Sequence, residues 1–214
     1  IFFMIYLIMV YVATQKARYL AIGFGGLAAA SVLGYKFFSQ VKVRVSVWLN
    51  PWADYENRGY QIAQSLFAIG TGGWFGMGLY QGAPTKIPIV ESDFIFSAIC
   101  EELGGLFAIC IILVYISCFV MFINISLQLT RPFYKLLAIG LSAGYAFQLF
   151  LTVGGVIKFI PHTGVTLPLI SYGGSSILST IIIFAVIQGL YLLKQKESEE
   201  QMYEEQQEYR AQAR

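Results

Sequence analysis

The sequence predicts an all-α, polytopic helical membrane protein with about five transmembrane spans in this chain. Three observations support this class: 57% of the 214 residues are hydrophobic, 12% are charged, and the mean hydropathy is +0.66. A soluble domain carries about 25% charged and about 45–50% apolar residues. Ten of the charged residues follow residue 193, so the preceding part has too few charges to cover a soluble surface. This composition disfavours nucleic-acid binding, a secreted disulfide scaffold and disorder.

Five apolar stretches are candidate membrane spans: four are long enough to cross a bilayer, and the first begins at the first residue of the chain. They cover about 1–13, 19–38, 94–123, 134–157 and 174–193. A bilayer needs about 20 apolar residues in a helix, so the third stretch is expected to tilt or to project beyond the membrane. Because the chain begins at Ile1 inside an apolar run, with no Met and no basic leader, we expect it to be part of a longer chain.

The short connections indicate how the spans are oriented. Lys16 and Arg18 lie between the first two stretches, and Arg131 and Lys135 lie at the connection between the third and the fourth. The tail at 194–214 contains four further basic residues. The positive-inside rule makes this side cytoplasmic, so we expect a multi-pass protein with a charged, cytoplasmic C-terminus.

The long segment at about 39–93 then falls on the extracellular side. Connections of this length are usually functional or disordered, and its many Trp, Tyr, Phe and Ile residues argue against disorder. Residues 60–69 have a helical apolar spacing that predicts an interfacial or re-entrant helix. We therefore expect the segment to fold against the spans.

Four acidic residues at the outer end of the third span are the strongest indication of chemistry. Glu91, Asp93, Glu101 and Glu102 lie within twelve residues, and ionisable groups at a membrane are unfavourable without a role. Asp93, next to Ser92, has two interpretations: a helix N-cap or a functional acid. On an ideal helix Glu101 lies about 80° around and about 12 Å along from Asp93, and Glu102 points the opposite way, which excludes a packed dyad. We favour a structural pairing role for the two glutamates.

A second informative segment covers residues 161–176 and combines turn residues with small residues. It begins the last span with Gly173, Gly174, Ser175 and Ser176. A helix N-terminus of this kind attracts phosphates, but a plain outer loop with close helix packing explains it as well. Ser171 is not in a Gly-x-Ser-x-Gly elbow, and we expect His162, the only histidine, to be a surface or satisfied residue.

Other residues give weaker signals. The glycines between Gly70 and Gly78 lack a βαβ context and a Gly-Lys-Ser/Thr sequence, so we interpret them as tight backbone packing beneath an outer loop. The spacings of the cysteines match no metal or redox motif. Four basic residues on the outer side would each be a solvated cation, but together with the acids they suit an anionic, lipid-linked substrate. These are Arg44, Arg58, Lys86 and Lys158.

At these motifs the sequence resembles the SEDS family (shape, elongation, division and sporulation), which contains the FtsW, RodA and SpoVE proteins. The matching motifs follow the family order across about 44–180 and are jointly specific. They are Asn50-Pro51, Gly59-Tyr60-Gln61, Gln64-Ser65, Ala68-Ile-Gly-x-Gly-Gly73, Asp93-Phe-Ile-Phe96, Glu101-Glu-Leu-Gly104, Pro161-x-Thr-Gly-x-x-Leu-Pro168 and Ser171-Tyr-Gly-Gly-Ser-Ser176. The family has ten spans, and the five stretches here would be its C-terminal half.

The resemblance implies a peptidoglycan glycosyltransferase that polymerises lipid II on the outer face of the bacterial plasma membrane, in cell-wall synthesis for shape, division or sporulation. Asp93 matches the family's essential loop aspartate, a proposed general base for the acceptor 4-hydroxyl. The residues expected to bind substrate are Arg44, Lys86, Glu91, Ser171, Gly173, Gly174, Ser175 and Ser176. Those expected to support the site are Gln61, Gln64, Glu101 and Glu102.

The resemblance also implies a class B penicillin-binding protein transpeptidase as partner, within the lipid bilayer and without nucleic acid. The resemblance implies no specific cofactor. A divalent cation that bridges a carboxylate and the substrate's pyrophosphate is compatible with this chemistry, although no ligand spacing in the sequence indicates a metal site. The chain departs from the family pattern in Ser92, where Thr is usual, in Thr152, where Asn is common, and in the loop at 78–88.

Two alternative functions remain open at this point. A flippase for lipid II or another lipid-linked precursor would need its critical acid near mid-membrane, as Glu101 or Glu102 would be. A non-catalytic scaffold that recruits a transpeptidase would depend on the spans and the tail but not on Asp93.

Overall fold

The computed structural model describes residues 1–212, in which all regular structure is helical. The helices and 3-10 turns of this part are α1 (Phe2–Thr14), α2 (Ala17–Phe37), α3 (Ser39–Leu49), η1 (Pro51–Asp54), α4 (Tyr60–Gly72), η2 (Pro84–Lys86), α5 (Ile95–Gln128), α6 (Pro132–Val156) and α7 (Gly174–Gln212). Four helices are long and apolar enough to cross a membrane: α2, α5, α6 and α7 over Gly174–Glu199. The predicted class, an all-α polytopic membrane protein, is confirmed.

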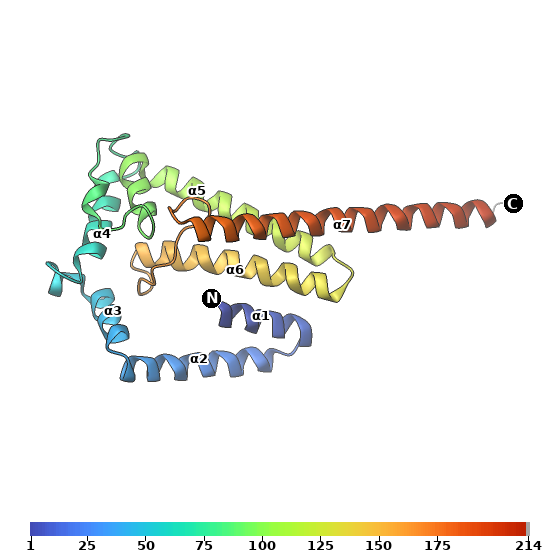
Figure 1. The fold of residues 1–214 in the computed structure, drawn as a ribbon, viewed down its shortest axis with the longest axis horizontal. Coiled ribbons are helices and arrows are strands. Elements are labelled where there is room, and N and C mark those ends of the chain that lie inside the picture. The colour runs from blue at the N-terminus through green and yellow to red at the C-terminus, as the bar shows by residue number, and fades with distance from the viewer. Residues whose placement is uncertain (213–214) are drawn as a thin grey trace.

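Helices α5, α6 and α7 lie side by side, and α1 packs against α6 with α2 beyond it (Figure 1). Helix α1, which covers the first apolar stretch, has 13 residues. Helix α7 extends well past the other helices toward the C-terminus (Figure 1). Arg131, just before α6, pairs with Glu197 of α7 at a distance of 3.0 Å from Nε to Oε1, which ties the α5–α6 turn to the start of this extension.

An aromatic cluster joins the three central helices. Phe122 of α5 lies edge-on to Tyr145 of α6 and to Phe184 of α7, with ring centroids 5.4 and 4.9 Å apart. Phe122 and Tyr145 are fully buried. By contrast, α2 has no buried residue, and many large apolar side chains on it face outward, as expected for a surface that lipid covers.

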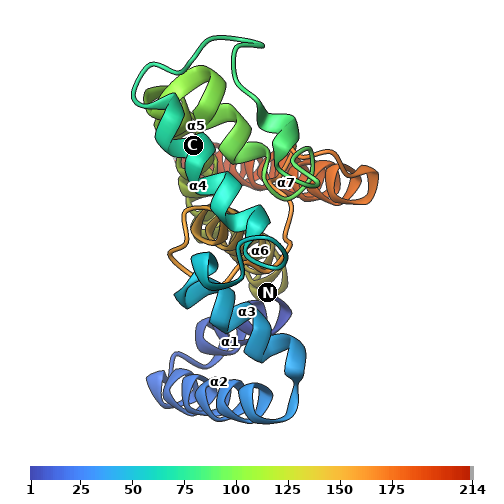
Figure 2. The same cartoon turned by 90° about the vertical axis from the view of Figure 1, so that its left-hand side faces the viewer.

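Helices α3 and α4 cross one end of the central bundle (Figure 2). This end also carries the connection between α6 and α7, at residues 157–173. The predicted helix at 60–69 is present as α4, and the long segment folds against α5, as expected. Trp48 of α3 donates from Nε1 to the Lys158 carbonyl at 3.0 Å, so α3 is also joined to the α6–α7 connection.

The third apolar stretch is not one continuous helix, because Gly104 interrupts α5 with φ 86° and ψ 167°. Residues 73–78 enter this break: the amides of Gly105 and Met77 donate to the carbonyls of Gly73 and Glu101, both at 2.8 Å. A side chain at Gly104 would collide with that backbone. The predicted tight glycine packing is therefore present, and it separates residues 95–103 from the apolar remainder of α5.

Candidate active site

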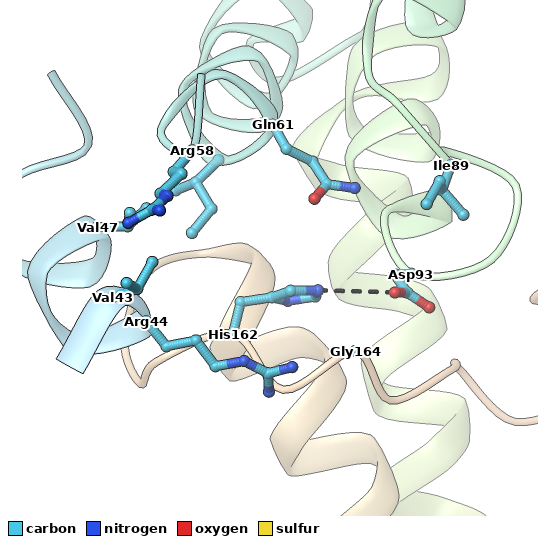
Figure 3. A pocket seen from close by; sticks show the side chains of 10 residues that line it. Val43, Arg44, Val47, Arg58, Gln61, Ile89, Asp93, His162 and Gly164 are labelled. Carbon is cyan, nitrogen blue, oxygen red and sulfur yellow. Dashed lines mark ion pairs between the residues drawn. The ribbon is translucent and has the colours of Figure 1, made fainter. Parts of the chain in front are cut away.

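A polar pocket of about 230 Å³ opens at the end of the bundle that α3 and α4 cross (Figure 3). It lies where α3, the start of α4, the segment before α5 and the segment after α6 meet. Its lining residues are Val43, Arg44, Val47, Arg58, Gln61, Ile62, Ile89, Asp93, His162 and Gly164. The pocket thus combines two guanidinium groups, one carboxylate and one imidazole, which come from segments far apart in the sequence.

Asp93 presents its carboxylate to this pocket from the turn before α5 (Figure 3). The backbone turns back on itself here: Ile89 has φ 56°, and its carbonyl accepts from the Asp93 amide at 3.4 Å. Ser92 Oγ donates to Asp93 Oδ1 at 2.8 Å. The N-cap residue of α5 is Phe94, and no side chain caps the helix, so the capping interpretation of Asp93 is wrong and its carboxylate is available to the pocket.

His162 faces Asp93 across the pocket, with Nε2 3.9 Å from Oδ2 (Figure 3). Its ring packs against Phe94, with centroids 4.4 Å apart. The pKa of His162 is lowered from its ordinary value of 6.5, chiefly because the ring is buried; Asp93 opposes this shift and Arg44 adds to it. The imidazole is therefore neutral at pH 7.

Two arginines and a glutamine complete the polar wall. Arg44 and Arg58 are exposed side chains that line the mouth of the pocket from α3 and from the turn before α4. Gln61 donates from Nε2 to the Pro88 carbonyl at 2.7 Å, which connects α4 to the loop that carries Asp93. The positive charges of the arginines suit a negatively charged ligand in this pocket.

Several residues expected to bind substrate lie outside the pocket lining. Lys86 and Glu91 are exposed, and the Glu91 carbonyl accepts from the Tyr172 amide at 2.8 Å. Ser171 is buried, and its Oγ accepts from the Leu167 amide at 2.7 Å, so this hydroxyl is used to shape the loop.

The start of α7 is likewise separate from the pocket. Gly173, Gly174, Ser175 and Ser176 do not line it. Thr166 Oγ1 donates to Ser176 Oγ at 2.7 Å, and Gln148 Nε2 donates to the Thr166 carbonyl at 2.9 Å. These contacts attach the loop at 161–173 to α6 and α7.

The two glutamates of α5 hold an outer loop. Glu101 Oε1 accepts from the Ala83 amide at 3.1 Å, and Glu102 Oε1 accepts from the Tyr80 amide at 3.3 Å. Both lie before the break at Gly104, in contact with the loop at 80–83. The Gln64 side chain is also engaged in a hydrogen bond within the protein, because its Nε2 donates to the Tyr55 hydroxyl at 2.9 Å.

The sequence interpretation missed one member of the pocket. His162 was expected to be a surface or satisfied side chain, yet it lines the same cavity as Asp93. Arg58, one of the four outer basic residues grouped with the acids, lines it as well. The one available signal was that the only histidine falls inside the 161–176 segment. Among the side chains that the structure describes, which exclude most of those after residue 199, no three His, Cys, Asp or Glu groups converge to hold a metal ion.

The fold and this site define a polytopic membrane protein with a charged pocket at one end of its helical bundle. The chain belongs to the FtsW/RodA/SpoVE family, because the family model, described as cell cycle protein, matches residues 1–196. This confirms the resemblance found in the motifs.

Curated relatives support the assignment. The chain is 43% identical over 182 residues to the peptidoglycan glycosyltransferase RodA of Mycobacterium tuberculosis, an alignment that covers 85% of this chain and 39% of that protein. It is 37% identical over 183 residues to the stage V sporulation protein E of Bacillus subtilis, covering 84% and 49% of the two chains. The chain therefore spans less than half the length of these relatives.

A solved structure has the same fold. One chain of a peptidoglycan synthase complex superposes with a TM-score of 0.68 at 24% identity, over 87% of this chain and 52% of that one.

Proposed function

We propose that this chain is the catalytic part of a peptidoglycan glycosyltransferase that polymerises lipid II on the outer face of the bacterial plasma membrane. The observation that carries the proposal is the position of Asp93 in a cavity with two arginines, in a chain 43% identical to a protein named peptidoglycan glycosyltransferase. A carboxylate with one oxygen bonded by Ser92 and the other facing an open pocket is suited to accept a proton.

In the proposed reaction, Asp93 takes the proton from the 4-hydroxyl of the acceptor sugar. The hydroxyl oxygen then bonds to the anomeric carbon of the donor, and the bond from that carbon to the diphosphate breaks. The electron pair leaves with the undecaprenyl diphosphate, and the anomeric configuration inverts. One carboxylate base is sufficient for each transfer, because the leaving diphosphate is already a stable anion.

Arg44 and Arg58 would stabilise the negative charge that develops on the leaving diphosphate. Both guanidinium groups reach the cavity that contains Asp93, and such fixed charges lower the barrier when they face the developing charge. Lys86 and Glu91, which are exposed beside this region, would contact the substrate only at its periphery. The start of α7, with Gly173 to Ser176, would act through the loop at 161–173 that carries His162.

A divalent cation, if used, would enter with the substrate's diphosphate. Among the residues whose side chains the structure describes, no three metal-binding groups converge. The reaction steps above use the protein's own residues alone.

The proposal places α3, α4 and the pocket outside the membrane and the C-terminus in the cytoplasm. The basic residues Lys16, Arg18, Arg131 and Lys135 all lie at the opposite ends of the helices, as the positive-inside rule requires. The partner we propose is a class B penicillin-binding protein transpeptidase, which would crosslink the glycan strand as it is made. The solved structure of similar fold is itself described as a complex that couples polymerization and crosslinking.

The alternative of a flippase is less well supported. A transport carboxylate would lie deep in the membrane, whereas Glu101 and Glu102 bond to the amides of the outer loop. The scaffold alternative can be distinguished from the transferase by mutation, because a scaffold does not require the Asp93 carboxylate.

The test uses the full-length protein, purified with its transpeptidase partner, and labelled lipid II. Wild type is expected to form glycan polymer and Asp93→Asn to form none, because an amide accepts no proton from the hydroxyl. Glu56→Gln is a matched control, since it removes a carboxylate from the same outer segment at an exposed position outside the pocket. Normal polymer from the Asp93→Asn protein would refute the general-base role, whereas no polymer from wild type would favour the scaffold.

A further inference from the structure

The strongest unassigned feature is the buried imidazole beside Asp93. His162 is the only histidine in the sequence, and its side chain is 14% exposed. Its Nε2 lies 3.9 Å from Asp93 Oδ2, while Ser92 Oγ bonds the other oxygen of the same carboxylate. Asp93 thus has a separate polar neighbour for each carboxylate oxygen.

Two glycines allow the chain to close around this pair. A Cβ at Gly155 would lie 3.0 Å from Nδ1 of His162, and a Cβ at Gly164 would lie 3.3 Å from Oδ2 of Asp93. Gly164 also has φ +70°, a conformation that other residues adopt with difficulty. On the remaining side the ring rests on Phe94, at 4.4 Å between centroids. The imidazole is therefore held in one place by packing.

The surroundings also determine which nitrogen carries the proton. Nδ1 is buried and has no hydrogen-bond partner among the described residues. A buried N–H without an acceptor is rarer in proteins than a buried acceptor without a donor. These surroundings therefore favour the neutral tautomer with its proton on Nε2, the nitrogen that faces Asp93.

We propose that His162 is a positioning residue for the general base, in which Nε2–H orients Oδ2 of Asp93 toward the acceptor hydroxyl. This inference rests on the proposed function of Asp93. The separation of 3.9 Å is longer than a hydrogen bond, and such contacts commonly shorten when substrate fills the site. With Ser92 and His162 each bound to one oxygen, the carboxylate cannot rotate, and its free lone pair faces the pocket. The substrate proton passes to Asp93, and His162 keeps its own proton throughout.

Three charged groups line the pocket together with the imidazole, each from a different segment packed around it. They are Asp93 from the turn before α5, Arg44 from α3 and Arg58 from the turn before α4. Asp93 raises the pKa of His162 and Arg44 lowers it, while burial lowers it further. The electrostatic coupling between the carboxylate and the ring can therefore be measured on the histidine itself.

The first experiment measures this coupling without any assay of activity. Diethyl pyrocarbonate modifies neutral imidazole, and mass spectrometry of the peptide that contains His162 gives the extent of reaction at each pH. The pH at which half of the maximal modification rate is reached reports the pKa of His162. In the full-length protein, Asp93→Asn is expected to move this midpoint to lower pH and Arg44→Gln to move it to higher pH. The control Glu56→Gln is expected to leave it in place. An unchanged midpoint in the Asp93→Asn protein would overturn the proposed contact.

The second experiment tests the positioning role with two variants of similar size. His162→Gln can place an amide N–H near the position of Nε2, whereas His162→Asn is too short to reach Asp93. We expect His162→Asn to lower kcat by about 10- to 100-fold with little change in KM, since misplacing a catalytic group has an effect of this size. His162→Gln is expected to retain more activity. Equal and nearly wild-type kcat in both variants would overturn the role.

The two proposals fail in different ways. If Asp93→Asn still makes polymer while the histidine midpoint shifts as expected, the contact exists but Asp93 is not the base. If Asp93→Asn abolishes polymer while neither histidine variant changes kcat, the base is confirmed and the positioning role is refuted.

Discussion

Replacing Gly104 by Ala should detach the outer loop at 73–78 from α5. Gly104 has φ 86° and ψ 167°, a region of backbone space that is essentially restricted to glycine. A Cβ at this position would lie 2.5 Å from the Trp74 carbonyl oxygen, closer than real Cβ atoms approach. Either the loop or the helix must move when the methyl group is added.

The size of the effect follows from what the movement would break. The unfavourable backbone conformation contributes about 1–3 kcal/mol. Four backbone hydrogen bonds hold the loop in the break, and each contributes about 0.5–1.5 kcal/mol. They run from the amides of Met77, Gly78, Gly105 and Leu106 to the carbonyls of Glu101, Glu102, Gly73 and Trp74. Because the movement relieves the strain but breaks these bonds, their loss predicts a destabilisation of about 2–6 kcal/mol.

The assay is thermal unfolding of the purified full-length protein in detergent, combined with limited proteolysis of the loop. Gly70→Ala is the matched control, because Gly70 lies inside α4 and a Cβ there meets no atom within 4 Å. Alanine at that position should be neutral or stabilise by up to about 1 kcal/mol. If Gly104→Ala melts at the same temperature as Gly70→Ala and resists protease equally, the backbone argument is wrong.

Two further predictions concern the same outer end. Burial holds the pKa of His162 below 6.5, so the unfolded protein binds more protons near that pH, and the folded protein should lose stability as pH falls below about 6.5. Melting curves taken across pH should show a weaker pH dependence of stability for His162→Gln. An unchanged dependence in that variant would refute the prediction. Glu101→Ala removes the acceptor for the Ala83 amide and should speed protease cleavage near residue 83. Glu101→Gln retains an acceptor oxygen and should leave the cleavage rate unchanged. Equal cleavage rates of the two variants would contradict this prediction.

The helical elements could be predicted from the sequence because each depends on local composition. Apolar runs of sufficient length become helices in a membrane, since an unpaired backbone is too unfavourable there. The helical spacing at 60–69 likewise marked α4 correctly. The interruption at Gly104 was missed, because a glycine within an apolar run shows a break only when another segment, here residues 73–78, fills it.

Part of the site could also be predicted from sequence. Asp93 lies within a recognisable motif and Arg44 was expected to bind substrate, and the structure places both in one cavity. The structural role favoured for Glu101 and Glu102 agrees with their bonds to loop amides. The position of Ser171 was not predictable in this way, because whether its hydroxyl faces a ligand or the Leu167 amide depends on how a loop folds.

By itself, the sequence determined the membrane class, the helical stretches, the family and the acid at the outer end of the third span, because hydropathy, charge and short motifs are local properties. Only the tertiary structure decided which groups surround that acid. Arg44, Arg58, Asp93 and His162 come from four segments spread over more than a hundred residues, and they meet because α3 and α4 cross the end of the bundle. The neutral state of His162 follows from the same burial, which no linear pattern records.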